Sequence, residues 1–191
     1  VKHPKDAYQD QLKIDGESKK LNYLGKPDYK KSKKDYVQLI DFFNTNNIEI
    51  HYLPIDQDTS LDSIYTHDPC IISNSGVILS NMGKKERQFE PEAIASYFNS
   101  INVPILGQIK SPGTLEGGDV IWIDERTVAV GEGYRTNAEG IRQFKSLLKN
   151  DVDKVIAVPL PHWTGPADCL HLMSNVSPID HDLYLVYSRL L

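Results

Sequence analysis

The sequence predicts an α/β fold built from repeated units of strand, strand, helix and strand. The stretch from Asp68 (DPCIISNSGVILSNMGKKERQFEPEAIASYF) and the stretch from Asp119 (DVIWIDERTVAVGEGYRTNAEGIRQFKSLL) follow the same pattern. Each has a short apolar run, a polar turn, a second apolar run, a turn with glycine and arginine, and an amphipathic segment. A third copy begins at His171, so the repeat recurs roughly every fifty residues, a period typical of arrays of one supersecondary unit.

The first complete unit is expected to end near Ile109. Its polar turn lies at Ser73 to Gly76, and its third strand spans Val103 to Ile109. Its helix places apolar side chains three and four residues apart, which predicts one buried face. These side chains are Ala93, Ile94, Tyr97 and Phe98.

The second unit repeats this order with a turn at Asp124 to Arg126 and a closing strand at Val155 to Leu160. Its helix is expected to bury Ile141, Phe144, Leu147 and Leu148. In the third copy we expect a strand through His171, a turn at Pro178 to Asp182 and a strand from Leu183 to Tyr187.

The first part of the chain reads as an earlier, partial unit. Val1 to His3 is expected to be the tail of a strand, and the polar segment from Lys5 to Gly25 a loop with short helical turns. A helix from about Pro27 to Asn46 should lead to a strand from Ile48 to Leu53. Its inward side chains would be Tyr36, Leu39, Ile40 and Phe43. We therefore expect residues 1–191 to form a single domain that is incomplete at its carboxyl-terminal end.

Composition restricts the classes of function. The net charge of −5 argues against a nucleic-acid surface, and the lysines between Lys30 and Lys34 are expected to form a solvated helix face. Two cysteines, Cys70 and Cys169, are too few for a disulfide framework. No apolar run has the length of a signal peptide or membrane span, so a cytoplasmic protein without a membrane partner is expected.

Two aspartates precede the first strand of the first unit. Asp62 and Asp68 lie in the segment LDSIYTHDP. Carboxylates that converge from strand ends can hold a planar cation with several N–H donors, such as a guanidinium. Alternatively, Asp68 and Pro69 begin a turn and Asp62 caps it.

The segment GTLEGGDV places two glycines between two acids. Gly117 and Gly118 let the backbone approach a ligand closely and direct Glu116 into a cavity that a larger side chain would fill. Asp119 follows at the start of the next strand. The alternative is a glycine bulge at a strand entrance, with Glu116 exposed.

His171 lies in the apolar segment DCLHLMS, where a lone histidine is commonly a buried core residue. The repeat places it at the position of Asp68 and Asp119 in earlier units. A pocket built from these equivalent positions would receive all three side chains. An imidazole whose pKa is held up by carboxylates can protonate a leaving amine and then activate water.

Arg87 and Arg135 follow the second strands of the two complete units. Above an acid-lined pocket they would suit a substrate with a guanidinium at one end and a carboxylate at the other. Exposed arginines at helix starts are the alternative. Cys70 is expected in the core rather than as a nucleophile, and no metal site is expected because His162, Cys169 and His171 match no common zinc spacing.

The segments THDP, LEGGDV, GYRTN and LHLMS resemble the guanidino-group-modifying superfamily, the penteins. This superfamily includes arginine deiminase, glycine amidinotransferase and dimethylarginine dimethylaminohydrolase. The resemblance implies an α/β-propeller of five strand-strand-helix-strand units, of which this chain would hold about three. Met173 stands where arginine deiminases have a second guanidinium-binding aspartate. The RTN of Arg135 to Asn137 and the spacing of Asp62 and Asp68 favour the dimethylarginine hydrolases.

The resemblance also implies residue roles. His171 and Glu116 would be catalytic, with His171 as general acid and base. Substrate would be bound by Asp62, Asp68, Asp119, Arg87 and Arg135. The family nucleophile is a cysteine of the last unit, and no residue here matches its motif, so this polypeptide alone is expected to be inactive. No cofactor is implied.

Three functions remain open from the sequence. The first is cysteine-dependent hydrolysis of the guanidine group of arginine or N-methylated arginine to citrulline and an amine. The second is amidino transfer between amino acids, and the third is a non-catalytic module that binds guanidino compounds. A small-molecule substrate is expected in each case, together with a second copy of the chain or the missing carboxyl-terminal part as partner.

Overall fold

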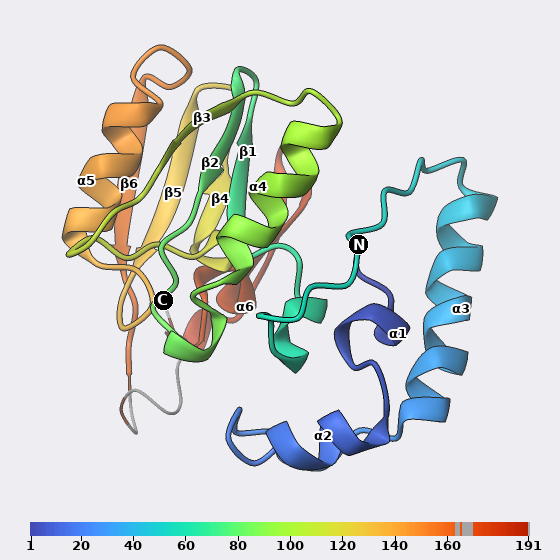
Figure 1. Ribbon diagram of the computed structural model, residues 1–191. Coiled ribbons are helices and arrows are strands. Elements are labelled where there is room, and N and C mark those ends of the chain that lie inside the picture. Colours follow the sequence, from blue (N-terminus) through green and yellow to red (C-terminus); the bar gives the residue numbers. More distant parts are fainter. Residues whose placement is uncertain (163–164, 166–169, 191) are drawn as a thin grey trace. The chain divides into compact units, whose positions relative to one another are not determined.

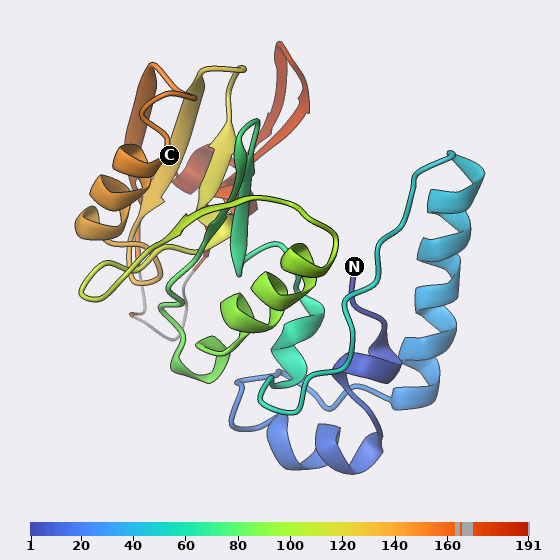
Figure 2. The ribbon, with the colours of Figure 1, turned by 45° about the horizontal axis from the view of Figure 1, so that its top comes forward.

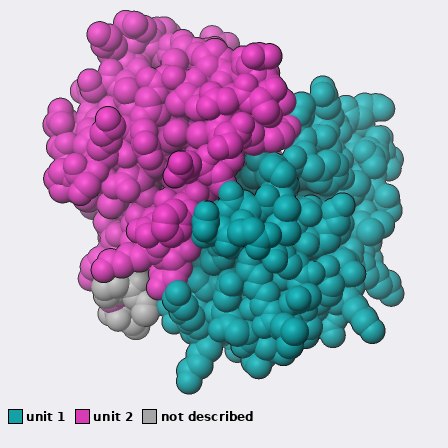
Figure 3. Space-filling model, viewed as in Figure 1, with its two compact units in different colours: residues 1–66 teal, residues 67–191 magenta. Residues whose placement is uncertain are grey.

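The computed structural model describes residues 1–162, 165 and 170–190, which form two compact units (Figure 1). Unit 1 comprises Val1–Thr66 and unit 2 comprises His67–Leu191, and Figure 3 colours them separately. Unit 2 holds the repeats that begin at Asp68, Asp119 and His171. None of the described helices is long and apolar enough to cross a membrane.

The first repeat of unit 2 has the predicted order. It consists of β1 (Cys70–Ser73), β2 (Gly76–Leu79), α4 (Glu90–Ser100) and β3 (Ile105–Gln108). β1 pairs antiparallel with β2, and β2 pairs parallel with β3. Gly76 has φ +145°, and a Cβ there would lie 2.4 Å from the Pro104 carbonyl oxygen, so the hairpin requires glycine at this position.

The second repeat has the same topology. It consists of β4 (Val120–Trp122), β5 (Thr127–Glu132), α5 (Ala138–Leu147) and β6 (Lys154–Pro159). β4 and β5 are antiparallel, and β5 and β6 are parallel. The prediction of repeated strand-strand-helix-strand units is therefore confirmed for these two copies.

The third copy differs from the prediction. The expected strand through His171 is wrong, because a short helix, α6 (Leu172–Asn175), follows this residue. The Asp119 carboxylate accepts the Leu172 N–H at 3.0 Å and so satisfies a free donor at the start of the helical turn. The hairpin of β7 (Val176–Asp180) and β8 (Leu183–Val186) comes next, and its turn is narrower than the predicted Pro178 to Asp182.

The two faces of the second sheet are covered by different helices (Figures 1 and 2). On β5, Val128 and Val130 face α5, whereas Ala129 packs with Leu172 of α6 on the other face. This alternation follows from the two-residue period of a strand. Among the described residues the strands form two three-stranded sheets and one two-stranded sheet, and no closed sheet is present.

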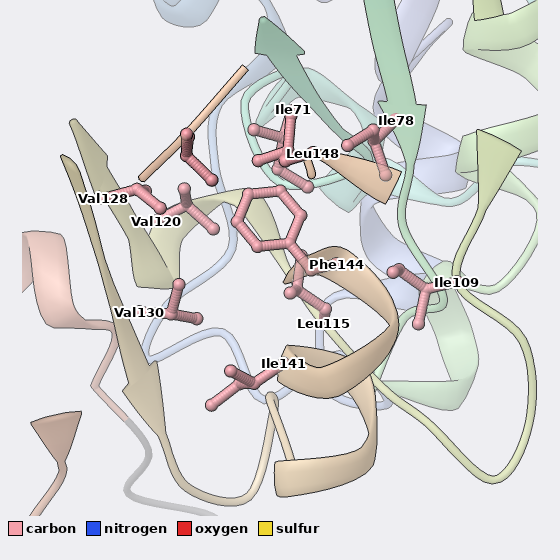
Figure 4. Close-up of a cluster of buried hydrophobic side chains, with 11 residues drawn as sticks. Ile71, Ile78, Ile109, Leu115, Val120, Val128, Val130, Ile141, Phe144 and Leu148 are labelled. Carbon is pink, nitrogen blue, oxygen red and sulfur yellow. The ribbon is translucent and has the colours of Figure 1, made fainter. Parts of the chain in front are cut away.

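The main hydrophobic core joins the first two repeats (Figure 4). Phe144 of α5 has no exposed surface and lies among side chains of both sheets. The core also contains Ile71, Ile78, Ile109, Leu115, Val120, Val128, Val130, Ile141, Leu148 and Val152. The predicted buried face of α5 is confirmed, since Ile141, Phe144 and Leu148 are buried and Leu147 packs against the cluster.

Unit 1 is mainly helical, with a small core of its own. It contains α1 (Pro4–Ala7), α2 (Gln11–Glu17), α3 (Tyr29–Thr45) and the 3-10 helix η1 (Leu61–Ile64). Asp10 and Asp28 accept backbone N–H groups at the starts of α2 and α3, as aspartate N-caps commonly do. The core consists of Ala7, Tyr8, Ile14, Leu21 and Leu61.

Three expectations for unit 1 are wrong. Val1 to His3 and Ile48 to Leu53 form no strand, although Val1 hydrogen-bonds to the backbone of His51 and Leu53. The predicted helix is present as α3, but it contains no buried residue. An amphipathic pattern records which face a helix could bury, and burial itself depends on what packs against that face.

Replacement of Phe144 by alanine should lower the free energy of unfolding by about 3 to 5 kcal/mol, because it leaves a cavity in the shared core. Chemical denaturation measures the loss. The matched control is Phe42→Ala, whose ring is 60% exposed on α3 and whose removal should have little effect. An equal effect of the two substitutions would contradict the assignment of the core.

Candidate active site

The starts of the three repeats in unit 2 converge on one cluster of charged side chains. Asp68 lies two residues before the start of the strand β1, Asp119 ends the 3-10 helix η3 (Gly117–Asp119), and His171 precedes α6. The His171 Nδ1 atom lies 3.2 Å from Asp119 Oδ1, and its Nε2 atom lies 3.8 Å from Asp68 Oδ1. Equivalent positions of consecutive units therefore meet at the imidazole.

Glu116 is buried with no exposed surface, and both of its carboxylate oxygens have partners. Oε1 accepts the backbone N–H groups of Gly83 at 2.9 Å and Lys84 at 3.1 Å. Oε2 accepts a hydrogen bond from Arg135 at 2.7 Å and lies 3.4 Å from His171 Nε2. The alternative of an exposed Glu116 at a strand entrance is thus wrong.

Asp68 is held by the backbone and by a buried arginine. Oδ1 accepts the Gly118 N–H at 3.0 Å, and Oδ2 accepts a hydrogen bond from Arg87, which also bonds to Glu90. Burial alone would raise the pKa of Asp68, but the charge of Arg87, with smaller contributions from His171, holds it below its usual value. Asp68 is therefore ionised at neutral pH.

The two glycines of LEGGDV allow this close approach. A Cβ on Gly118 would lie 2.7 Å from the His171 Cγ atom and 2.8 Å from Asp68 Oδ1. A Cβ on Gly117 would lie 2.2 Å from the carbonyl oxygen of His67. Any larger residue would separate the acids from the imidazole, so the glycines are needed for this close packing. The predicted close approach of the backbone to a ligand stays a prediction.

Asp119 supports the second nitrogen of the imidazole. Its contact with His171 Nδ1 has the distance of an ion pair, although the angle falls short of a hydrogen bond. Burial of His171 opposes protonation, but the contact with Asp119 and the charges of Asp68 and Glu116 outweigh it and raise the pKa above 6.5. The histidine is thus poised to carry a proton near neutral pH.

Thr136 was given no role by the sequence analysis, yet it lies between the acids. Its hydroxyl accepts the Glu116 backbone N–H at 3.1 Å and donates to Asp119 Oδ2 at 2.6 Å. Its neighbour Asn137 accepts the Thr114 N–H and caps α5. Only the RTN spacing after β5 could have indicated it, since each of these residues bonds to the segment that carries Glu116.

The two arginines of the sequence analysis both face carboxylates of the protein. Arg87 is 4% exposed and bonds to Asp68 and Glu90. The Arg135 side chain is 22% exposed and bonds to Glu116. Asp62 lies in unit 1, where it is buried in η1. Its part in substrate binding stays a prediction.

Cys70 is 7% exposed, and burial raises the pKa of its thiol to about 12. A thiol with such a pKa is protonated at neutral pH and is a poor nucleophile, so the prediction that Cys70 belongs to the core is confirmed. Cys169 lies outside the described residues. The nucleophile therefore has no candidate in the part of unit 2 that the structure describes.

One group of described residues has the spacing of a metal site. Ligand atoms of Asp68, Glu116 and His171 all lie within 4.8 Å of one another. Both carboxylates already accept hydrogen bonds from arginine side chains, which shows that a guanidinium fits beside them. Each of these two carboxylates is thus paired with a guanidinium group of the protein itself.

Comparison with known proteins identifies the family. The sequence profile of the arginine deiminase family matches residues 60–191. The chain belongs to this family. It is 29% identical over 161 residues to an N(G),N(G)-dimethylarginine dimethylaminohydrolase of Pseudomonas aeruginosa, over 84% of this chain and 60% of that protein. It is also 29% identical over 149 residues to an arginine deiminase of Bacillus cytotoxicus, over 73% of this chain and 35% of that protein.

A solved structure of a dimethylarginine dimethylaminohydrolase from Pseudomonas aeruginosa, a cysteine-to-serine mutant complexed with citrulline, superposes with a TM-score of 0.74. The sequences are 30% identical, and the match covers 85% of this chain and 61% of the other. The chain is thus a member of the guanidino-modifying superfamily with a mixed α/β fold. It spans about three-fifths of the length of the Pseudomonas aeruginosa hydrolase and about one-third of the length of the arginine deiminase.

The raised pKa of His171 makes a prediction about stability. A group that binds its proton more tightly in the folded state stabilises the fold fully below its unfolded pKa, near 6.5, and this contribution is lost as pH rises through the folded pKa. His171→Gln should therefore cost more stability below pH 6.5 than at alkaline pH. Chemical denaturation on a pH series measures the difference.

The same argument requires Asp119→Asn to lower the pKa of His171, which NMR titration of the imidazole resonances reports directly. The control is Asp180→Asn, which removes the same charge from an exposed site beside His181 and should leave the His171 titration unchanged. An unchanged His171 titration in Asp119→Asn would show that Asp119 does not set its protonation.

Proposed function

We propose that this chain supplies the guanidinium-binding acids and the general acid/base histidine of a cysteine-dependent hydrolase. The enzyme would convert arginine or N-methylated arginine to citrulline and ammonia or a methylamine. The observation that carries this proposal is the imidazole of His171 within 3.4 Å of a buried carboxylate that already binds a guanidinium, that of Arg135.

The buried carboxylates of the cluster suit a cationic ligand. Four of them, those of Asp68, Glu90, Glu116 and Asp119, lie around the two arginines and His171 within the described part of unit 2. Because a buried carboxylate needs a counter-charge, a substrate guanidinium beside Asp68 and Glu116 would be stabilised as the Arg135 guanidinium is.

Arg135 occupies the position that this substrate group would take. We infer that an entering guanidinium displaces the Arg135 side chain from Glu116 Oε2. The freed arginine could then pair with the substrate carboxylate, in line with the role that the family resemblance gives to it. Glu116 stays in place meanwhile, since its other oxygen is fixed by the N–H groups of Gly83 and Lys84.

The chemistry then follows from the positions of the protons. A cysteine thiolate, which the resemblance places in the last unit of the family fold, attacks the guanidinium carbon. The carbon–nitrogen bond breaks as His171 protonates the departing amine, leaving a thiouronium. His171, now neutral, takes a proton from water, and the hydroxide adds to the same carbon. Cleavage of the carbon–sulfur bond releases citrulline and regenerates the thiolate.

Asp119 contributes to both halves of this cycle. Its charge stabilises the imidazolium that donates a proton to the amine and the imidazolium that forms when water is activated. Asp68 and Glu116 hold the guanidinium plane, and their charge supports the cationic thiouronium. Arg87 is already bonded to Asp68 and Glu90, and we assign it to holding Asp68 ionised and in position.

In the full-length protein, Glu116→Gln should weaken binding of L-arginine at least tenfold, about 1.4 kcal/mol or more. The reason is that the bound guanidinium of the ligand loses its counter-charge. Isothermal titration calorimetry measures this change. Glu125→Gln removes the same charge from an exposed turn and should bind arginine as the unaltered protein does. Equal affinities of the two variants would contradict the assignment of the site.

Product analysis separates the three functions. Hydrolysis predicts citrulline from arginine or dimethylarginine in the absence of an acceptor amine. Amidino transfer predicts a product only when glycine or ornithine is added. Saturable binding without any product would leave the guanidine-binding module as the function.

A further inference from the structure

The hydroxyl of Thr136 bonds to both acid-bearing ends of the segment from Glu116 to Asp119. It is fully buried, 3.1 Å from the Glu116 backbone nitrogen and 2.6 Å from Asp119 Oδ2. Neither contact involves the surface of the protein. The residue thus links the backbone that carries Glu116 to the carboxylate beneath His171.

The chemistry of these partners fixes the direction of both hydrogen bonds. A backbone N–H can only donate, so the Glu116 nitrogen uses a lone pair of the hydroxyl. An ionised carboxylate can only accept, so the single hydroxyl proton of Thr136 must point to Asp119 Oδ2. A hydrogen bond to a charged acceptor in a buried site is among the stronger ones in a protein.

The remaining oxygen of Asp119 is also held. Oδ1 accepts the Leu172 N–H at 3.0 Å and lies 3.2 Å from His171 Nδ1. With one oxygen fixed by Thr136 and the other by the start of α6, the carboxylate plane cannot rotate without the loss of a buried hydrogen bond. The orientation of the carboxylate determines which ring nitrogen of His171 lies beside its negative charge.

We propose that Thr136 is a positioning residue for the reaction: its hydroxyl fixes the Asp119 carboxylate against Nδ1 of His171 and so directs Nε2 toward the substrate site. This proposal rests on the proposed function only in naming His171 as the acid and base. The charged groups that face the imidazole are Asp119 on Nδ1 and Glu116 and Asp68 on Nε2, the last two paired with Arg135 and Arg87.

The residues on either side of Thr136 are also bonded, and they hold the backbone that carries its hydroxyl. Arg135 bonds to the Glu116 side chain, and Asn137 accepts the Thr114 N–H. Asn137 also caps α5 through the Gly140 N–H at 2.8 Å. Three consecutive side chains are therefore bonded to one short segment, and the start of a helix anchors them.

The test compares Thr136→Val, which keeps the shape and removes the hydroxyl, with Thr136→Ser, which keeps the hydroxyl. The readout is an NMR titration of His171 in the full-length protein. In Thr136→Val the pKa of His171 should fall and the share of the neutral ring with its proton on Nδ1 should decrease, because Asp119 is no longer held against that nitrogen. Thr136→Ser should restore both properties.

The matched control is Thr127→Val, which removes another threonine hydroxyl beside an aspartate, Asp124, at the β4–β5 turn. It should leave the His171 titration unchanged. Where arginine turnover is measurable, Thr136→Val should lower kcat roughly tenfold with KM within about twofold, as is typical for loss of a residue that orients a reacting group.

A double-mutant cycle separates positioning from simple structural support. If Thr136 acts through Asp119, then Thr136→Val should have no effect on the His171 titration in the Asp119→Asn background. A folded Thr136→Val with an unchanged His171 pKa and tautomer would overturn the proposal. Should Thr136→Val not fold, Thr136→Ala, which also lacks the hydroxyl, answers the same question. The titration of His171 needs no turnover. It therefore tests the role of Thr136 even if the protein hydrolyses no arginine, and product analysis tests the proposed hydrolysis separately.

Discussion

The structure of unit 2 depends on the burial of several carboxylates around one imidazole. Asp68, Glu116 and Asp119 are each less than 10% exposed, and a buried carboxylate persists only where cations and N–H donors compensate it. Backbone amides of Gly83, Lys84, Gly118 and Leu172 supply part of this compensation, and arginines and His171 supply the rest. The need for positive charge and N–H donors is the reason for which we propose a flat cation with several N–H groups as the ligand.

The repeated architecture explains how such an unfavourable cluster can be assembled. Each repeat contributes a polar residue at its start, and packing of the first two repeats through the core around Phe144 brings two of these positions together. The third arrives with α6, whose Leu172 packs on the opposite face of the second sheet. Apolar packing on both faces of the sheet thus supplies the free energy that holds the charged groups in place.

Much of this arrangement could be predicted from the sequence, because it depends on local patterns. The alternating strands, the apolar face of α5 and the glycines beside Glu116 have signatures that span a few residues, and the repeat made Asp68, Asp119 and His171 equivalent. The rest depends on partners distant in the chain. The helical turn after His171 is capped by Asp119, the hydroxyl of Thr136 is placed by Glu116 and Asp119, and α3 has an apolar face that no described residue buries. Apart from the RTN spacing after β5, no local pattern in the sequence indicates these contacts.

The most direct test of the central claim, that these acids and the imidazole form a guanidinium site, is a crystal structure of the protein with bound citrulline or arginine. The account predicts that the guanidino or ureido group lies between Asp68 and Glu116 within hydrogen-bond distance of His171 Nε2, with the Arg135 side chain moved away from Glu116. A ligand bound elsewhere, with the Arg135–Glu116 pair intact, would contradict it.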